Sequence, residues 1–230
     1  MEAQVHALLR QAAEWRLIGR LFECPVGAWR DDIAALAREV EDPLLGSAVA
    51  HALEEASEGL YHSTFGPGGP APPREVSYVT AVQLGYLLSE IEAFYDGFAY
   101  RPVTLESPDH VSVEAGFVGY LRLKEAYAVT RGDEDQAAVT AEAAATFTRE
   151  HLTAIAEPLA ATLEASSLAY LAEAARALAN RVGPPPSAIA PPPAGRLLPV
   201  IQPIEDEDEI ACEGTGGRDV WVSPGTRAGR

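Results

Sequence analysis

Apolar side chains recur at steps of three and four residues along most of residues 1–182, which is typical of amphipathic α-helices. In the first predicted helix they form a single stripe made of Val5, Leu8, Leu9, Ala12, Trp15, Ile18, Leu21 and Phe22. The same spacing predicts six further helices, near residues 31–40, 43–61, 78–98, 109–132, 133–155 and 168–182. No segment shows the two-residue alternation of a β-strand. The pattern therefore predicts an all-α fold, a single helical-bundle-like globular domain of about seven helices.

Two segments between predicted helices are too rich in proline and glycine to remain helical. Residues 65–73 read Phe-Gly-Pro-Gly-Gly-Pro-Ala-Pro-Pro, and residues 100–108 contain two prolines. Proline removes a backbone N–H and clashes with the preceding turn of a helix. We therefore expect two loops, over residues 61–78 and 100–110, each containing aromatic side chains and carboxylates. Loops of this kind often carry function.

The composition changes at Gly183. Residues 184–186 and 191–193 are triple-proline runs, and residues 205–209 are an unbroken acidic run. Such segments bury too little apolar surface to offset the entropy of folding. We therefore predict an all-helical domain over residues 1–182 and a Pro-rich, acidic, largely disordered tail over residues 183–230.

The chain is strongly acidic, with 17 Lys and Arg against 34 Asp and Glu, which gives a formal net charge of −17. Nucleic acids and anionic membranes attract basic surfaces, so this charge argues against both as partners. It would attract a basic partner, although a well-solvated helical surface explains the acidity equally well. The N-terminus lacks the features of a signal peptide, no apolar run approaches about 20 residues, and two cysteines make no disulfide framework. We expect a cytoplasmic protein.

Motifs for phosphate binding or for hydrolysis are missing from the sequence. A metal site needs three or four converging ligands, and among the five histidines only His110 and His151 adjoin a carboxylate, that of Asp109 and that of Glu150. Asp109 is itself a plausible N-cap for the predicted helix that follows. We therefore expect no catalytic residue, no metal and no cofactor.

Four short motifs, taken in order, resemble one known family. They are Tyr-His-Ser-Thr-Phe-Gly-Pro at residues 61–67, Pro-Arg-Glu-Val-Ser-Tyr at residues 73–78, Glu-Ser-Pro-Asp-His at residues 106–110 and Phe-Thr-Arg-Glu-His-Leu at residues 147–152. With Val113, Glu114 and Phe117 they resemble the TorD-like redox-enzyme maturation chaperones, which include DmsD- and NarJ-like proteins. The resemblance runs from about Ala12 to Ala179.

This resemblance implies an all-helical chaperone and not an enzyme. Members bind the twin-arginine signal peptide, and often the body, of a molybdopterin-dependent oxidoreductase, and hold it back until its cofactors are inserted. The implied partner is such a precursor, and a homodimer is among the expected assemblies.

A binder of a twin-arginine signal needs carboxylates for its arginines and an apolar groove for its apolar segment. The carboxylates, aromatic side chains and neighbouring groups of the two loops and of the helix after them are the candidates for the signal-peptide site. They are Tyr61, Phe65, Glu75, Tyr78, Glu106, Pro108, Asp109, His110, Glu114 and Phe117.

Two alternatives of other classes stay open. One is an α-helical, metal-dependent hydrolase that uses His62, Asp109, His110 and His151, which requires these side chains to converge around a metal. The other is a structural subunit of an oxidoreductase complex, which would co-purify with the mature, cofactor-loaded enzyme.

Overall fold

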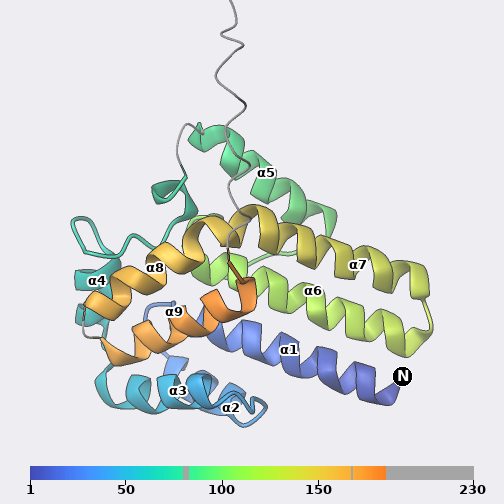
Figure 1. The fold of residues 1–230 in the computed structure, drawn as a ribbon, viewed down its shortest axis with the longest axis horizontal. Coiled ribbons are helices and arrows are strands. Elements are labelled where there is room, and N and C mark those ends of the chain that lie inside the picture. Colours follow the sequence, from blue (N-terminus) through green and yellow to red (C-terminus); the bar gives the residue numbers. More distant parts are fainter. Residues whose placement is uncertain (80–82, 167, 185–230) are drawn as a thin grey trace, which may run out of the picture. The chain divides into compact units, whose positions relative to one another are not determined.

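The structure is a computed structural model, and it describes residues 1–79, 83–166 and 168–184 (Figure 1). These residues belong to one compact unit that contains nine α-helices and no strand beyond an isolated β-bridge. The α-helices are α1 (Glu2–Leu21), α2 (Trp29–Ala37), α3 (Pro43–Glu55), α4 (Glu58–Phe65), α5 (Leu84–Gly97), α6 (Val111–Arg131), α7 (Glu134–Phe147), α8 (Thr153–Ala165) and α9 (Ala169–Val182). The prediction of an all-α fold is confirmed, with more helices than the expected seven. The predicted disordered tail lies outside the described residues, apart from Gly183 and Pro184.

The higher helix count arises because two predicted helices are divided. The predicted helix at residues 43–61 stops at Ala56, which is extended, and the Ser57 hydroxyl then accepts from the Leu60 N–H to cap α4. The predicted helix at residues 133–155 widens into a π-helical turn, η2 (Thr148–Leu152), between α7 and α8. Pro158 lies inside α8 rather than ending it.

Several predicted helix starts agree with the structure. Pro43 is the first residue of α3, and the Asp42 side chain accepts from the backbone N–H groups of Leu44 and Leu45. The Asp133 side chain likewise caps α7 by accepting from the Gln136 N–H. By contrast α5 begins at Leu84 and not near residue 78, and residues 75–77 form a separate 3-10 turn, η1 (Glu75–Ser77).

Helices α1 and α6 run side by side in the middle of the unit (Figure 1). Their backbones approach so closely that glycine is needed on both helices. A Cβ on Gly19 of α1 would lie 2.8 Å from the Ser112 carbonyl oxygen, and one on Gly119 of α6 would lie 3.1 Å from the Ala12 carbonyl oxygen. This crossing fixes the spacing of the two helices that later form a groove.

A cluster of aromatic rings joins α5, α6 and α7. The ring of Phe117 lies 4.8 Å from that of Phe147 and 4.8 Å from that of Tyr95, and Phe94 lies 5.3 Å from Phe147. Such edge-on contacts stabilise a core beyond the area that they bury. Helix α5 is therefore attached to α6 and α7 through Phe94 and Tyr95.

We predict that Gly19→Ala destabilises the protein by about 1–3 kcal/mol, because the new methyl group forces two backbones apart. The matched control is Gly46→Ala in α3, where a Cβ would meet nothing within 4 Å. We expect Gly46→Ala to stabilise by roughly 0.5–1 kcal/mol, because alanine is the better helix former. Urea unfolding followed by circular dichroism measures both, and shifts of the same sign would contradict the close helix crossing.

Candidate functional site

The two predicted loops pair with each other. Arg74 and His110 form an isolated antiparallel β-bridge. The Glu75 N–H donates to the Asp109 carbonyl at 2.8 Å, and the Val111 N–H donates to the Pro73 carbonyl at 2.9 Å. We call residues 73–76 and 108–111, with these contacts, the loop bridge. It brings together two of the motifs that carry the sequence resemblance.

An ion pair reinforces the loop bridge. The Arg74 Nε donates to Asp109 Oδ1 at 2.8 Å, and the Val76 N–H donates to Oδ2 at 3.4 Å. Asp109 is fully buried, whereas part of the Arg74 side chain reaches solvent. A buried carboxylate requires such partners, because desolvation otherwise disfavours its charge. Asp109 therefore holds the two loops together.

The prediction that Asp109 caps the next helix is wrong by one residue. Helix α6 begins at Val111, and its N-cap is His110, whose Nδ1 accepts from the Ser112 N–H at 3.2 Å. The physical reason is that the Asp109 carboxylate is already occupied by Arg74 and by the backbone of the other loop.

Because Nδ1 of His110 accepts a hydrogen bond, its ring proton lies on Nε2. That nitrogen lies 3.4 Å from the Tyr61 hydroxyl and 3.9 Å from Glu106 Oε2, and Tyr61 donates to Glu106 Oε1 at 3.0 Å. Burial lowers the pKa of His110 to about 4, although the nearby carboxylates of Glu106 and Asp109 oppose this shift. His110 is therefore neutral at physiological pH.

A second buried polar group lies beside the loop bridge. Glu75 Oε2 lies 3.1 Å from His151 Nδ1, and both side chains are almost completely buried. Burial raises the pKa of Glu114 well above its ordinary value, and the carboxylates of Glu75 and Asp109 raise it further. Neither Glu114 oxygen has a hydrogen bond of normal geometry among the described residues, but Glu75 is close enough to accept its proton. Burial therefore favours the neutral, protonated form of Glu114.

The structure buries most of the predicted site residues. The buried ones are Tyr61, Phe65, Glu75, Asp109, His110, Glu114 and Phe117, whereas Tyr78, Glu106 and Pro108 are partly exposed. Tyr61, Glu106, Asp109 and His110 come together at the loop bridge, with Glu75 and Glu114 behind them. Glu106 is the one predicted carboxylate that a partner could reach from solvent.

The structure has a groove beside this cluster, and none of the predicted site residues lines it. It has a volume of about 630 Å³ and runs between α1, the first half of α6 and residues 100–104. Its apolar lining includes Leu9, Ala12, Leu36, Val113, Tyr120 and Leu123. The signal that could have indicated it is the apolar character of Val103 and Leu105 within a proline-containing loop, where both side chains are fully exposed.

Carboxylates gather where the groove approaches the loop bridge. Glu23 lines the groove. Burial, then the nearby Glu106 and, least of all, the charge of Glu23 raise the pKa of Tyr61. Burial and then the charges of Glu58 and Glu106 raise the pKa of the Cys24 thiol. Glu58 lies beside Cys24, Glu106 accepts from the Tyr61 hydroxyl, and Glu23 directly precedes Cys24, so we call these three carboxylates the anionic end.

The sequence profile of the family described as nitrate reductase delta subunit matches residues 28–161, which is more than half of the chain. The chain belongs to the nitrate reductase delta subunit family. This is a family of molybdoenzyme maturation chaperones, so the sequence-based resemblance to redox-enzyme maturation chaperones is confirmed. No curated protein and no solved structure matches the chain.

Delta-family membership implies a molybdoenzyme catalytic subunit as the partner and a maturation factor rather than a catalyst. The matched range contains the loop bridge, α6 and η2, whereas α1, one wall of the groove, precedes it. None of the helices in the described part of this delta-family chain is long and apolar enough to cross a membrane.

The convergence that a hydrolase would require is not found in the described residues. Asp109 contacts Arg74, and His110 faces Tyr61 and Glu106. His151 pairs with Glu75, and His62 lies exposed on α4. The described part of the chain contains one cluster of potential metal ligands, and of the four proposed hydrolase residues it includes only His62.

We predict that Glu114→Gln flattens the dependence of stability on pH. The folded protein holds a proton on Glu114 that the unfolded chain releases near its ordinary pKa of 4.5, so wild-type stability falls as the pH rises above that value. The decline is at most about 1.4 kcal/mol for each pH unit. Glutamine has the same shape as glutamate, its side-chain amide can donate a hydrogen bond to Glu75, and it does not titrate. Urea unfolding from pH 5 to pH 8 measures the effect, and parallel profiles for the two proteins would contradict a protonated Glu114.

For His110 we predict that the stability of the fold changes with pH in the opposite direction. The folded pKa of about 4 lies below the ordinary value of 6.5, so this residue's contribution is complete above pH 6.5 and is lost as the pH falls through 4. His110→Asn keeps an N-cap acceptor and removes the titration. The stability of the wild type should therefore fall by up to about 3 kcal/mol more than that of His110→Asn between pH 6.5 and pH 4. Thermal unfolding measures this difference. If the wild type and His110→Asn lost the same stability, His110 would not be neutral in the folded protein.

Proposed function

We propose that this delta-family protein binds the twin-arginine signal segment of a molybdopterin-dependent oxidoreductase in the cytoplasm and holds the apoenzyme back until its cofactor is inserted. One observation carries the proposal: an apolar groove adjoins the anionic end. A twin-arginine signal has matching parts, a basic region followed by an apolar region. The basic region lies at the anionic end, and the apolar region lies along α1 and α6.

The exposed apolar side chains beside the groove support this assignment. Val103 and Leu105 are fully exposed, and Leu9 and Leu123 on the facing helices are 41% and 49% exposed. Contiguous exposed apolar surface of this kind marks a site that a partner covers. Tyr100 and Tyr120, whose rings lie 5.2 Å apart, add aromatic surface to the same groove.

The carboxylates of the anionic end can receive a basic peptide, while Glu23 also pairs with Arg20, and Arg16, Arg20 and Arg101 line the groove. The side chains of Glu23, Glu58 and Glu106 are 29%, 65% and 36% exposed, so solvent and a partner can reach all three. An arginine binds a carboxylate through two parallel N–H groups, which gives both energy and orientation. The net charge of −17 also attracts a basic segment from a distance.

In this proposal the buried members of the predicted site act as positioning residues. Asp109 fixes the loop bridge through Arg74, and Tyr61 orients Glu106 through its hydroxyl group. Tyr95 donates to the Pro108 carbonyl at 2.9 Å and so ties the same loop to α5. These contacts hold Glu106 at the end of the groove without themselves reaching the client.

We predict that Val103→Ser and Glu106→Gln each weaken the binding of a twin-arginine peptide by about tenfold. The estimate follows from the burial of one valine side chain or from one charge-assisted hydrogen bond, each about 1.5 kcal/mol or more. Fluorescence anisotropy with a labelled peptide of Arg-Arg followed by an apolar segment measures both. Replacing Arg-Arg by Lys-Lys should weaken binding to the wild type and have less effect on Glu106→Gln.

The matched control is Val139→Ser on α7, because Val139 is also an exposed valine but does not line the groove. It should bind the peptide as the wild type does. If Val139→Ser weakened binding as much as Val103→Ser, or if neither groove variant changed it, the groove would not be the client site.

A further inference from the structure

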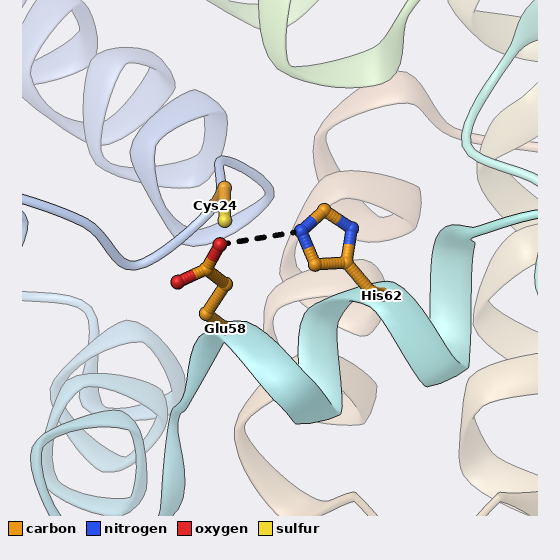
Figure 2. Close-up of side chains that lie close together, drawn as sticks. All are labelled: Cys24, Glu58 and His62. Carbon is orange, nitrogen blue, oxygen red and sulfur yellow. Dashed lines mark ion pairs between the residues drawn. The ribbon is translucent and has the colours of Figure 1, made fainter.

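Cys24 and His62, which the proposed function does not use, form a cluster with Glu58 of the anionic end. The thiol of Cys24, just after α1, faces the side chains of Glu58 and His62 on α4, and the three side chains point toward one another (Figure 2). One ligand atom from each residue lies within 4.8 Å of the other two. It is the only group of this kind in the part of the chain that the structure describes.

The local structure explains why these side chains meet. Glu58 and His62 are four residues apart on α4, so they lie on the same face of the helix, with Glu58 Oε1 3.7 Å from His62 Nε2. Such a pair by itself is an ordinary exposed helix contact. Cys24 makes this pair a candidate metal site, because its sulfur, which comes from a separate part of the chain, adds a third type of ligand.

The distances suit a tetrahedral ion. Zinc bonds to nitrogen and oxygen ligands are about 2.0–2.2 Å and bonds to sulfur about 2.3 Å, so neighbouring ligand atoms around a tetrahedral zinc lie about 3.4–3.7 Å apart. The Glu58–His62 separation of 3.7 Å already falls at this spacing. The exposed side chains of Glu58 and His62 can turn by the small amounts that bring the sulfur within the same range.

We propose that Cys24, Glu58 and His62 bind a divalent transition-metal ion of the zinc class. The ligands are the Cys24 Sγ, a Glu58 carboxylate oxygen and the His62 Nε2. A thiolate and an imidazole select such ions over magnesium or calcium, which prefer oxygen alone. Three protein ligands leave a fourth position for water, as in other zinc sites with three side-chain ligands.

The electrostatics of the surroundings favour a cation. The Glu58 carboxylate has an oxygen within 4.8 Å of the Cys24 sulfur, so its negative charge acts at the site. The same field attracts a dication. When the metal binds, the thiol proton is released to solvent, and the thiolate together with the Glu58 carboxylate balances the two positive charges.

Cobalt(II) is a suitable probe, because cobalt bound to a thiolate gives a charge-transfer absorption band that zinc then removes by displacement. The full chain carries Cys212→Ser, so that Cys24 is the only source of this band. Titration should give one cobalt per chain. Cys24→Ser should abolish the band, and Glu58→Gln and His62→Ala should each lower affinity by at least about tenfold. Circular dichroism confirms that these surface variants remain folded.

His51→Ala is the matched control. His51 Nδ1 lies 2.9 Å from Glu173 Oε2, which makes an exposed His–Glu pair that has no cysteine beside it. This variant should bind cobalt like the parent. A parent chain without the band, a band that survives Cys24→Ser, or equal losses in His51→Ala and His62→Ala would overturn the proposal. The readout uses no client peptide, so its outcome is separate from that of the proposed function.

Discussion

The pairing of residues 73–76 with residues 108–111 is the constraint on which the rest of the site depends. Two backbone hydrogen bonds and the Arg74–Asp109 ion pair join segments that lie on either side of α5 in the sequence. This pairing determines where α6 begins and makes His110 its N-cap. It also fixes the loop that carries Glu106 and the exposed Val103 and Leu105. The buried polar cluster and Glu106 of the anionic end therefore take their positions from it, whereas the crossing of α1 and α6 fixes the groove.

The buried cluster shows how carboxylates are accommodated in a helical core. Asp109 accepts from Arg74 and from the Val76 N–H, and Glu75 has His151 as a partner. Glu114, which has no such partner in the described residues, keeps its proton instead. Each carboxylate is therefore either paired or neutral, and together they specify one arrangement of the loops rather than a reactive site.

The groups that a partner can reach, Glu106 and the groove, lie closer to the surface than this buried cluster. Tyr61 connects the core with the surface, because its ring lies 5.2 Å from that of Phe65 in the core while its hydroxyl contacts Glu106 near the surface. The groove beside it is walled on one side by α1, which precedes the range matched by the family profile. The family match thus covers the loop bridge and α6, which position one side of the groove. The other side of the groove, on α1, lies outside that match.

The sequence by itself determined the all-helical fold, the starts of α3 and α7, most of the two loops and the family, because these depend on local spacing and on short motifs; residues 61–65 of the first predicted loop are helical, as the end of α4. Only the tertiary structure decided that Glu75, Asp109 and Glu114 are buried, that α1 and α6 border a groove, and that Cys24 meets His62. The physical reason is that periodicity shows which face of a helix is buried but not which segment covers it. A carboxylate looks the same in sequence whether water or an arginine solvates it, so its role depends on contacts between residues far apart in the chain.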